Sequence, residues 1–287
     1  MQASRVGVIG LGMMGGGIAR ALLDADLPVL VHDVRPEAAT PLVELGARDC
    51  PSPALMAIDC EVVLVVVFDS AQVEDVIFGS VGLAGAVSHS LVVLVCSTID
   101  PGDVEAFAAR GAQCGIDVID VGIAGGPSAA VTGTLVSMVG GSAGAAAAAK
   151  QVLDAMSLDV IHAGPVGSGM KLKLVKNTMS YLTMCAVHEA LLLGEEIGFD
   201  AALVRRVAEH SNLVDDFFWF PMSRSGARPL AADDDPAAID AARFFAAVAE
   251  KDLQAALQVG ERAGVDLPAA RLAKAQVNRF FRVPSND

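Results

Sequence analysis

The sequence is poor in positive charge and in cysteine. Its 20 Lys and Arg residues stand against 34 Asp and Glu residues, so the formal net charge is −14. This balance lacks the basic surface that binding a phosphate backbone requires, which excludes nucleic acid as the expected partner. The five cysteines are odd in number and form no CxxC pair, and the five histidines are scattered. We therefore expect neither a disulfide scaffold nor a metal site, and we place the chain in the reducing cytoplasm.

Long hydrophobic runs are also missing, and we expect no secretory leader. Hydrophobic residues make up 53% of the chain and its mean hydropathy is +0.52. Apolar runs such as residues 62–68 are nevertheless far shorter than the roughly 18 residues of a membrane helix. Residues 1–5 lead directly into a strand pattern, without the apolar segment and cleavage site of a signal peptide. Runs of this length are typical of strands buried on both faces of a parallel sheet, so we expect no membrane partner.

The first half of the chain alternates short β-branched runs with helical stretches. Such alternation predicts βαβ units and an α/β domain with a mostly parallel sheet. We expect strands at residues 6–9, 28–32, 62–68, 91–95, 118–121 and 134–139. We expect helices at residues 16–25, 37–45, 103–112 and 143–156.

After about residue 164 the strand signal ends. Apolar residues at helical spacing predict an all-α region, in which the acidic residues 233–235 form an exposed turn and a helix start. The 287 residues thus divide into an α/β domain over residues 1–164 and an all-α domain over residues 165–287, joined by a long helix. The predicted helices of the second domain are residues 170–197, 201–211, 236–263 and 268–281.

Residues 10–15 have GxGxxG spacing and follow the first predicted strand. In a dinucleotide-binding Rossmann domain the first glycine permits a tight turn and the second lets the backbone approach a pyrophosphate. The third lets the following helix pack on the strand. The strand before the motif and the helix after it favour this interpretation over a glycine-rich turn that binds nothing. The predicted cofactor contacts in this turn are Gly10, Leu11, Gly12, Met13, Met14 and Gly15.

Asp33 ends the second predicted strand, 18 positions after Gly15, near the expected spacing of about 20. Its carboxylate would accept hydrogen bonds from a ribose 2′-hydroxyl and repel a 2′-phosphate, which favours NAD. Arg35 leaves NADP open, because its guanidinium could hold a 2′-phosphate. We expect Asp33, Val34 and Arg35 to bind the cofactor, with NAD ahead of NADP.

Several motifs occur in the order found in the β-hydroxyacid dehydrogenases. Over nearly its whole length the chain resembles enzymes of the 3-hydroxyisobutyrate dehydrogenase and tartronate semialdehyde reductase type, with 6-phosphogluconate dehydrogenase a more distant relative. The resemblance implies a Rossmann domain plus a helical domain for substrate binding and oligomerisation. It also implies an active site in the cleft between the two domains and a homodimer or homotetramer. The motifs are residues 10–15 with Asp33, 97–98, 120–126, 133–135, 167–177 and 251–253.

The family's substrate motif, DxPxSGG, corresponds to DVGIAGG over residues 120–126. The resemblance implies that the backbone amides of Gly125 and Gly126 hold the substrate carboxylate. This chain departs from the pattern at two positions. Ala124 replaces a serine that adds a hydroxyl contact, and Gly122 replaces the proline. Residues 124–126 are therefore the expected substrate site, and the substrate itself stays open.

The family's catalytic motif, GxGxxxKxxNN, corresponds to GSGMKLKLVKN over residues 167–177. It implies that Lys173 is the catalytic lysine and Asn177 the second asparagine, with Lys176 in place of the first. Lys173 and Asn177 are four residues apart, so both lie on one face of the predicted helix. Lys176 is either a substrate contact or a salt-bridged structural residue.

Oxidation of an alcohol requires that the hydroxyl proton be removed as the hydride leaves. Lys173 can accept this proton only if its pKa, about 10.4 in water, is lowered. Burial, the charge of an oxidised nicotinamide and the nearby Lys176 would all lower it. The apolar neighbours Leu172, Leu174 and Val175 predict a buried stretch of helix, against the alternative of a surface lysine.

Four further positions, Lys251, Thr98, Val67 and Phe68, have both a functional and a structural interpretation. Lys251 matches the family's KDL motif, which implies a place near the substrate or the nicotinamide rather than on a helix surface, whereas Asp252 is expected to be structural. Thr98 would contact the ribose or the substrate, or else cap the following helix. Val67 and Phe68 would line the cofactor groove, or else only pack.

Two groups in the helical domain have more than one interpretation. Residues 217–220, FFWF, are unusual in a chain with 5% aromatic content. They could wall the substrate pocket, or form a subunit interface or part of the helical core. Arg224 and Arg228 could meet a substrate carboxylate or face solvent.

The expected function is NAD(P)-dependent hydride transfer between nicotinamide and a 3-hydroxy acid or its semialdehyde, with Lys173 as general acid/base. The changes at Ala124 and Lys176 leave open a reductase of another carbonyl or of an imine, although similar imine reductases usually lack the lysine. A homologue that binds the dinucleotide without turnover is the alternative outside the enzyme class.

Overall fold

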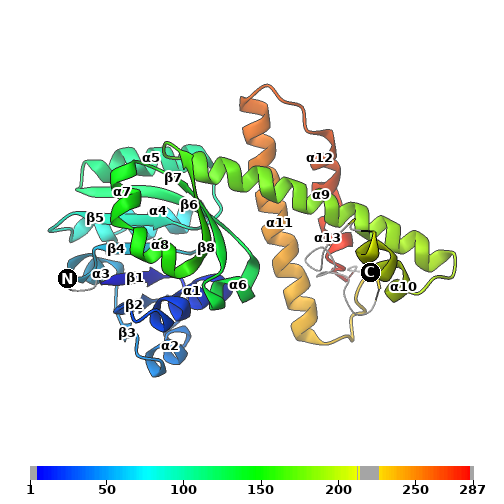
Figure 1. Cartoon of the computed structure of the whole chain (residues 1–287), viewed down its shortest axis with the longest axis horizontal. Helices are drawn as coiled ribbons and strands as arrows, with labels where there is room; N and C mark the ends of the chain where they lie inside the picture. Colours follow the sequence, from blue (N-terminus) through cyan, green and yellow to red (C-terminus); the bar gives the residue numbers. More distant parts are fainter. Residues whose placement is uncertain (1–4, 212, 214–225, 285–287) are drawn as a thin grey trace. The chain divides into compact units, whose positions relative to one another are not determined.

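The computed structural model describes residues 5–211, 213 and 226–284 (Figure 1). The chain divides into two compact units, Met1–Lys173 and Leu174–Asp287. The division falls inside one long helix, whereas the sequence places the boundary between residues 164 and 165. Each unit has hydrophobic clusters of its own.

The first unit is built on an eight-stranded sheet. Its strands are β1 (Val6–Ile9), β2 (Val29–His32), β3 (Arg48–Asp49), β4 (Val62–Val65), β5 (Leu91–Val95), β6 (Ile116–Ala124), β7 (Leu135–Gly140) and β8 (Ser157–Gly164). They lie in the order β3-β2-β1-β4-β5-β6-β7-β8, and only the β6–β7 pair is antiparallel. The strand order reverses between β1 and β4. In open α/β sheets the ligand crevice forms at this switch point, outside the carboxyl ends of the strands.

Helices cover this sheet on both faces. They are α1 (Met13–Asp24), α2 (Thr40–Glu44), α3 (Pro53–Asp59), α4 (Ser70–Phe78), α5 (Pro101–Ala112), α6 (Gly126–Thr132), α7 (Ala143–Ala148) and α8 (Lys150–Met156). Short 3-10 turns occur at η1 (Pro36–Ala38) and η2 (Leu83–Gly85).

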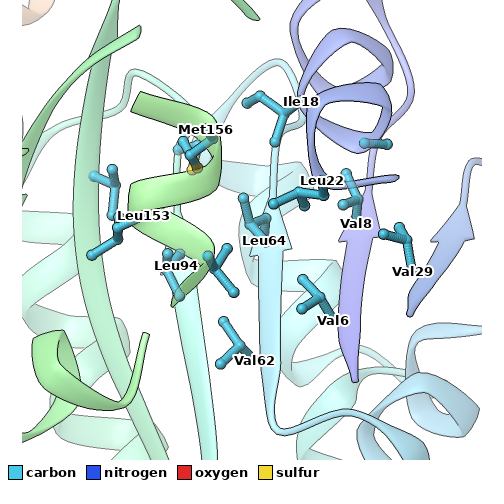
Figure 2. Packing of buried hydrophobic residues seen from close by; sticks show 14 of the residues in the cluster. Val6, Val8, Ile18, Leu22, Val29, Val62, Leu64, Leu94, Leu153 and Met156 are labelled. Carbon is cyan, nitrogen blue, oxygen red and sulfur yellow. The ribbon is translucent and has the colours of Figure 1, made fainter. Parts of the chain in front are cut away.

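Successive strand residues face opposite sides of the sheet, which produces two hydrophobic clusters. In β1 and β4, Val8 and Leu64 belong to one cluster, whereas Val63 and Val65 belong to the other. Figure 2 shows the first cluster, in which Ile18 and Leu22 of α1 and Leu153 and Met156 of α8 pack against the strands. Full burial of each such side chain stabilises the fold by about 1.5–3 kcal/mol. The cluster fixes α1 on the sheet, and with it the glycine turn that precedes α1.

The predicted α/β class is confirmed, and several predicted bounds are corrected. The strand expected at residues 62–68 ends at Val65. The helix expected at residues 37–45 is the turn η1 followed by α2, and the helix expected at 143–156 is interrupted at Ala149, between α7 and α8. Strands β3 and β8 and helices α3, α4 and α6 were not expected from the sequence.

The described part of the second unit contains helices and no strand. They are the part of α9 (Ser168–Glu196) after Lys173, then α10 (Ala201–His210), α11 (Pro236–Arg262), α12 (Pro268–Ala275) and α13 (Val277–Phe280). Tyr181 and Met184 of α9 pack with Leu253 of α11 and Phe280 of α13 in one buried cluster. The helix expected at residues 268–281 is broken at Gln276. Asp235 caps the start of α11, as the acidic turn predicts.

Candidate active site

The glycine turn joins β1 to α1 and leaves one side open. Gly10 has a φ of +89°, and a Cβ there would fall 2.5 Å from the carbonyl oxygen of Val66. A Cβ at Gly15 would fall 1.9 Å from the carbonyl oxygen of Gly10, so helix and strand require this glycine. A Cβ at Gly12, the N-cap of α1, would meet nothing within 4 Å. The turn therefore offers open space beside the free N–H groups of a helix N-terminus, which fits a dinucleotide pyrophosphate.

Asp33 follows β2 and is bonded to the glycine turn. Its Oδ2 accepts the Leu11 N–H at 2.7 Å, and its Oδ1 accepts the Arg35 N–H at 2.9 Å and Arg35 Nε at 3.2 Å. Burial raises the pKa of Asp33, but these donors outweigh burial and leave the pKa below its ordinary value. The carboxylate is thus ionised and held beside the turn. Val34, between Asp33 and Arg35 in the sequence, is 90% exposed.

The carboxyl ends of β4 and β5 are tied together at the same edge of the sheet. The Ser97 hydroxyl accepts the Val67 N–H at 2.9 Å and donates to the Val65 carbonyl at 3.4 Å. Ser97 is buried, Val67 is half-buried and Phe68 is exposed. These residues lie at the strand ends where a cofactor would bind.

Thr98 is half-buried at the same edge, and its expected alternative role as a helix cap is wrong. The N-cap of α5 is Asp100, whose Oδ1 accepts the Gly102 N–H at 2.8 Å. Thr98 precedes that cap by two residues.

Asp120 holds the start of α9 against β6. Its carboxylate is fully buried and accepts the Gly167 N–H at 2.7 Å and the Met170 N–H at 2.6 Å. Burial raises the pKa of Asp120 above its ordinary value, although the two N–H groups act in the opposite direction. The two hydrogen bonds join Asp120 to residues that lie 47 and 50 positions later in the chain. They bring the catalytic motif to the substrate motif.

The same contact depends on two glycines. A Cβ at Gly122 would fall 2.6 Å from Lys173 Cβ and 2.9 Å from the Gly169 carbonyl oxygen. A Cβ at Gly169 would fall 2.2 Å from the Met138 carbonyl oxygen. The first turn of α9 therefore lies directly on the sheet backbone, with the Lys173 side chain over Gly122.

Lys173 reaches the end of β6. Its Nζ donates a hydrogen bond of 2.5 Å to the Ile123 carbonyl oxygen, and the side chain is half-buried. Ala124 follows, and then Gly125 and Gly126, whose φ values of +128° and +73° require glycine as the chain turns into α6. The first unit thus places Lys173 next to residues 124–126, the predicted substrate site.

The expected burial around Lys173 is only partly correct. Leu174 is 2% exposed, but Leu172 and Val175 are 37% and 58% exposed. Apolar residues lie on several sides of α9 around Lys173, so the sequence of this stretch does not show which side of the helix is buried.

In the second unit, four side chains of α9 and α11 form a hydrogen-bonded cluster. Asp252 Oδ2 accepts Asn177 Nδ2 at 2.7 Å and the Tyr181 hydroxyl at 3.1 Å, and Asp252 Oδ1 accepts Lys251 Nζ at 3.0 Å. Asn177, Tyr181 and Asp252 are buried, and Lys251 is half-buried. Burial and the charge of Asp252 raise the pKa of Tyr181 well above its ordinary value. The cluster joins the predicted Asn177 and Lys251.

The remaining predicted residues are Lys176, Arg228 and a segment that lies outside the described residues. Lys176 is half-buried on α9. Arg228 is exposed, and its guanidinium forms an ion pair of 3.0 Å with the Glu196 carboxylate. Residues 217–220 and Arg224 lie outside the described residues.

Sequence reasoning missed what Asp120, Gly122, Tyr181 and Asp252 do. Asp120 and Gly122 belong to the substrate motif and Asp252 to the KDL motif, but a motif names positions and not contacts. Tyr181 is four residues after Asn177, so it lies on the same face of the helix, and this spacing is the signal that could have found it. Among residues 5–211, 213 and 226–284, no group of three or more His, Cys, Asp or Glu could hold a metal ion. Within the same residues no helix is long and apolar enough to cross a membrane.

The sheet with its glycine turn and Asp33 defines a dinucleotide-binding Rossmann domain. A family model for the NAD binding domain of 6-phosphogluconate dehydrogenase matches residues 5–164. A second model, for the NAD-binding of NADP-dependent 3-hydroxyisobutyrate dehydrogenase, matches residues 167–284. The chain belongs to the β-hydroxyacid dehydrogenase family, and it is an NAD(P)-dependent dehydrogenase.

Individual relatives agree with this assignment. An uncharacterised oxidoreductase of Mycobacterium tuberculosis is 34% identical over 286 residues, covering 100% of this chain and 96% of that protein. The 3-hydroxyisobutyrate dehydrogenase of Pseudomonas aeruginosa is 35% identical over 207 residues, covering 72% of this chain and 70% of that protein. The solved 3-hydroxyisobutyrate dehydrogenase of Salmonella typhimurium has a TM-score of 0.83 at 26% identity, covering 96% of this chain and 93% of that one. An imine reductase from Pseudomonas sp., at 19% identity and a TM-score of 0.67, shares the fold alone.

Proposed function

We propose that this protein transfers a hydride between nicotinamide and a 3-hydroxy acid or its semialdehyde, with Lys173 as general acid/base. The observation that carries the proposal is the hydrogen bond of 2.5 Å from Lys173 Nζ to the Ile123 carbonyl. It holds the amine at the end of β6, directly before residues 124–126. A 3-hydroxy acid held by its carboxylate on residues 124–126 would present its hydroxyl-bearing carbon, two bonds from the carboxylate carbon, near that amine.

The proposed roles follow from the groups that each residue offers. The N–H groups of Gly125 and Gly126, on consecutive positive-φ glycines, would hold the substrate carboxylate. Ala124 adds no hydroxyl there, and Lys176 and Lys251 are the further residues that we propose to contact the substrate. A bound nicotinamide supplies or accepts the hydride.

In oxidation Lys173 would take the proton of the reacting hydroxyl, and in reduction it would return that proton. Asn177 would assist by hydrogen bonding. The imine reductase alternative gains no support from a shared fold, and the lysine argues against it.

Three finer predictions accompany the proposal. NAD is the preferred cofactor, because the ionised Asp33 would repel a 2′-phosphate. A homodimer or homotetramer remains the expected assembly. The apolar Leu193, Ile197 and Val207 on or next to α9 and α10 are each more than 60% exposed, which supports it. A cytoplasmic location also stays a prediction.

The test is Lys173→Ala, compared with Lys150→Ala as a matched surface control. Lys150 is an exposed lysine of α8 that pairs with Asp154. General acid–base catalysis contributes about 10²–10⁴-fold, so kcat of K173A should fall by that factor. Reduced-nicotinamide fluorescence should show unchanged cofactor binding in both variants, and K150A should keep its turnover. Turnover retained by K173A on a panel of 3-hydroxy acids and semialdehydes would remove the lysine from the mechanism.

A further inference from the structure

The cluster around Asp252 sets the direction in which Asn177 can hydrogen bond. Asp252 is 2% exposed and receives three donors, two of them on Oδ2. A buried carboxylate of this kind persists because donors and a nearby cation replace the water it has lost. An ionised carboxylate only accepts hydrogen bonds. Whatever faces Asp252 Oδ2 must therefore donate.

This requirement fixes the amide of Asn177. Its nitrogen Nδ2 lies 2.7 Å from Asp252 Oδ2, and the reverse orientation would place two acceptors against each other. The oxygen and the nitrogen of a carboxamide lie on opposite sides of Cγ. With the nitrogen committed to Asp252, Oδ1 is the group at the other end of the amide. Asn177 thus presents an acceptor away from Asp252.

Tyr181 strengthens this arrangement from the next turn of the same helix. Its hydroxyl donates to the same Oδ2 at 3.1 Å, four residues after Asn177. Because burial and the charge of Asp252 raise the pKa of Tyr181, the hydroxyl keeps its proton, and so its ability to donate, beyond the pH at which an ordinary tyrosine loses it. Two donors from consecutive turns of α9 hold Oδ2, and Lys251 of α11 holds Oδ1. The carboxylate cannot rotate without losing one of them.

We infer that Asn177 serves the reaction as a hydrogen-bond acceptor, and that Asp252 and Tyr181 are positioning residues that fix this polarity. The inference rests on the proposed function, in which Asn177 assists Lys173. An acceptor suits a reaction whose donors are a substrate hydroxyl and a lysine ammonium. Asn177 Oδ1 would orient the N–H or O–H that carries the transferred proton, and it would not compete with Lys173 for the substrate oxygen.

An exchange of the two side chains tests the polarity. In N177D alone, two carboxylates face each other, and in D252N alone the Asn177 amide loses its fixed orientation. Each single variant should lose about 10- to 100-fold in kcat, the range for one lost hydrogen bond to a charged group. In the double variant N177D/D252N, Asn at position 252 donates to Asp at position 177, and position 177 again offers an acceptor.

The double variant should therefore exceed both single variants in kcat by about tenfold, which is a positive coupling in a double-mutant cycle. Its activity in oxidation should also require a higher pH, because the new carboxylate favours the charged form of Lys173. A double variant no more active than N177D would mean that Asn177 acts as a donor, and the inference would be wrong.

Tyr181 offers a milder variant and a direct spectroscopic probe. Y181F should lower kcat by about three- to tenfold with little change in KM, because one of two donors on Oδ2 remains. Ser180→Ala is the matched control. Ser180 is a buried neighbour on α9 whose hydroxyl donates to the Lys176 carbonyl, outside the cluster, so S180A should keep its kcat. Equal losses in S180A and Y181F would overturn the positioning role of Tyr181.

A measurement that does not depend on turnover distinguishes a failure of the Asp252 cluster from a failure of the proposed function. Tyr181 is the only tyrosine of the chain, so [¹³Cζ]tyrosine gives a single NMR resonance. This resonance should move in D252N and stay in place in K173A and S180A. A resonance that D252N does not move would overturn the cluster itself. A resonance that moves as expected, together with full turnover in K173A, would overturn the proposed function and leave the cluster in place.

Discussion

Both oxygens of the Asp33 carboxylate accept hydrogen bonds, and these bonds fix the charge that a cofactor ribose would meet. Leu11 N–H belongs to the glycine turn, and Arg35 donates from its backbone and its side chain. The Arg35 guanidinium is thus already paired with a carboxylate whose pKa is lowered. A 2′-phosphate would have to displace that pair and approach a negative charge. The Asp33–Arg35 pair therefore favours NADH over NADPH.

The prediction is that NADH binds more tightly than NADPH and that Asp33→Asn removes the preference. Asparagine keeps an acceptor for the Leu11 N–H but loses the charge. The NADH advantage should therefore shrink by about tenfold or more, the equivalent of one charged hydrogen bond. Parallel titrations followed by nicotinamide fluorescence measure this, with D49N as the control, since Asp49 is an exposed carboxylate of the neighbouring strand β3. Tighter NADPH binding by the wild type would mean that Arg35 outweighs Asp33.

At the scale of elements, the contact of α9 with β6 positions the proposed general base. Asp120 accepts two N–H groups from the start of α9, and the absence of a side chain at Gly122 admits the Lys173 stem. An acidic residue near a helix N-terminus also stabilises the helix electrostatically. The lysine is therefore placed by the backbone of β6 as well as by its own rotamer.

Gly122→Ala should displace Lys173. The added Cβ would stand 2.6 Å from Lys173 Cβ, so α9 must shift or the stem must bend. Misplacement of a catalytic group by about 1 Å can cost about 100-fold, and overpacking costs about 1–3 kcal/mol of stability. The matched control is Gly111→Ala in α5, whose Cβ would fall 2.9 Å from Val118 Cγ2, away from Lys173. Both variants should lower Tm, and only G122A should lower kcat. A kcat for G122A equal to that of G111A would show that Gly122 matters for packing alone.

Elements and contacts could be predicted from the sequence where the residues that form them are close together in the chain. The glycine turn and Asp33 lie within one βαβ unit, and β1 and β5 were predicted with the bounds that the structure shows. Strand β8 was missed because it is an edge strand whose middle residues are exposed, so it has neither a hydrophobic run nor a clear alternation. The Asn177–Asp252 contact joins residues 75 positions apart. Only the packing of α9 against α11 brings them together, and no local pattern records it.

At the scale of the whole molecule, buried ionisable groups connect local packing to the free energy of unfolding. His188 of α9 is 5% exposed, and its Nδ1 has no hydrogen-bond partner among the described residues. Burial lowers the pKa of His188, as does Arg279, while Glu189 and Glu195 act in the opposite direction and Arg282 lowers it slightly. The folded protein therefore holds this imidazole neutral under conditions in which the unfolded chain would begin to protonate it.

The sign of the pH effect follows from this difference. Below the ordinary pKa of 6.5 the unfolded chain binds a proton that the folded protein resists, so stability falls as the pH falls. The contribution of one such group is at most about 1.36 kcal/mol per pH unit. His188→Leu removes both the titration and the unpartnered nitrogen. The free energy of unfolding of H188L should thus equal or exceed that of the wild type at pH 7.5, and its advantage should grow toward pH 5.5. Urea unfolding at several pH values measures the difference, in which the titration of the other groups cancels. Parallel curves for the two proteins would mean that His188 titrates alike in the folded and unfolded chain, and that its burial does not resist the proton.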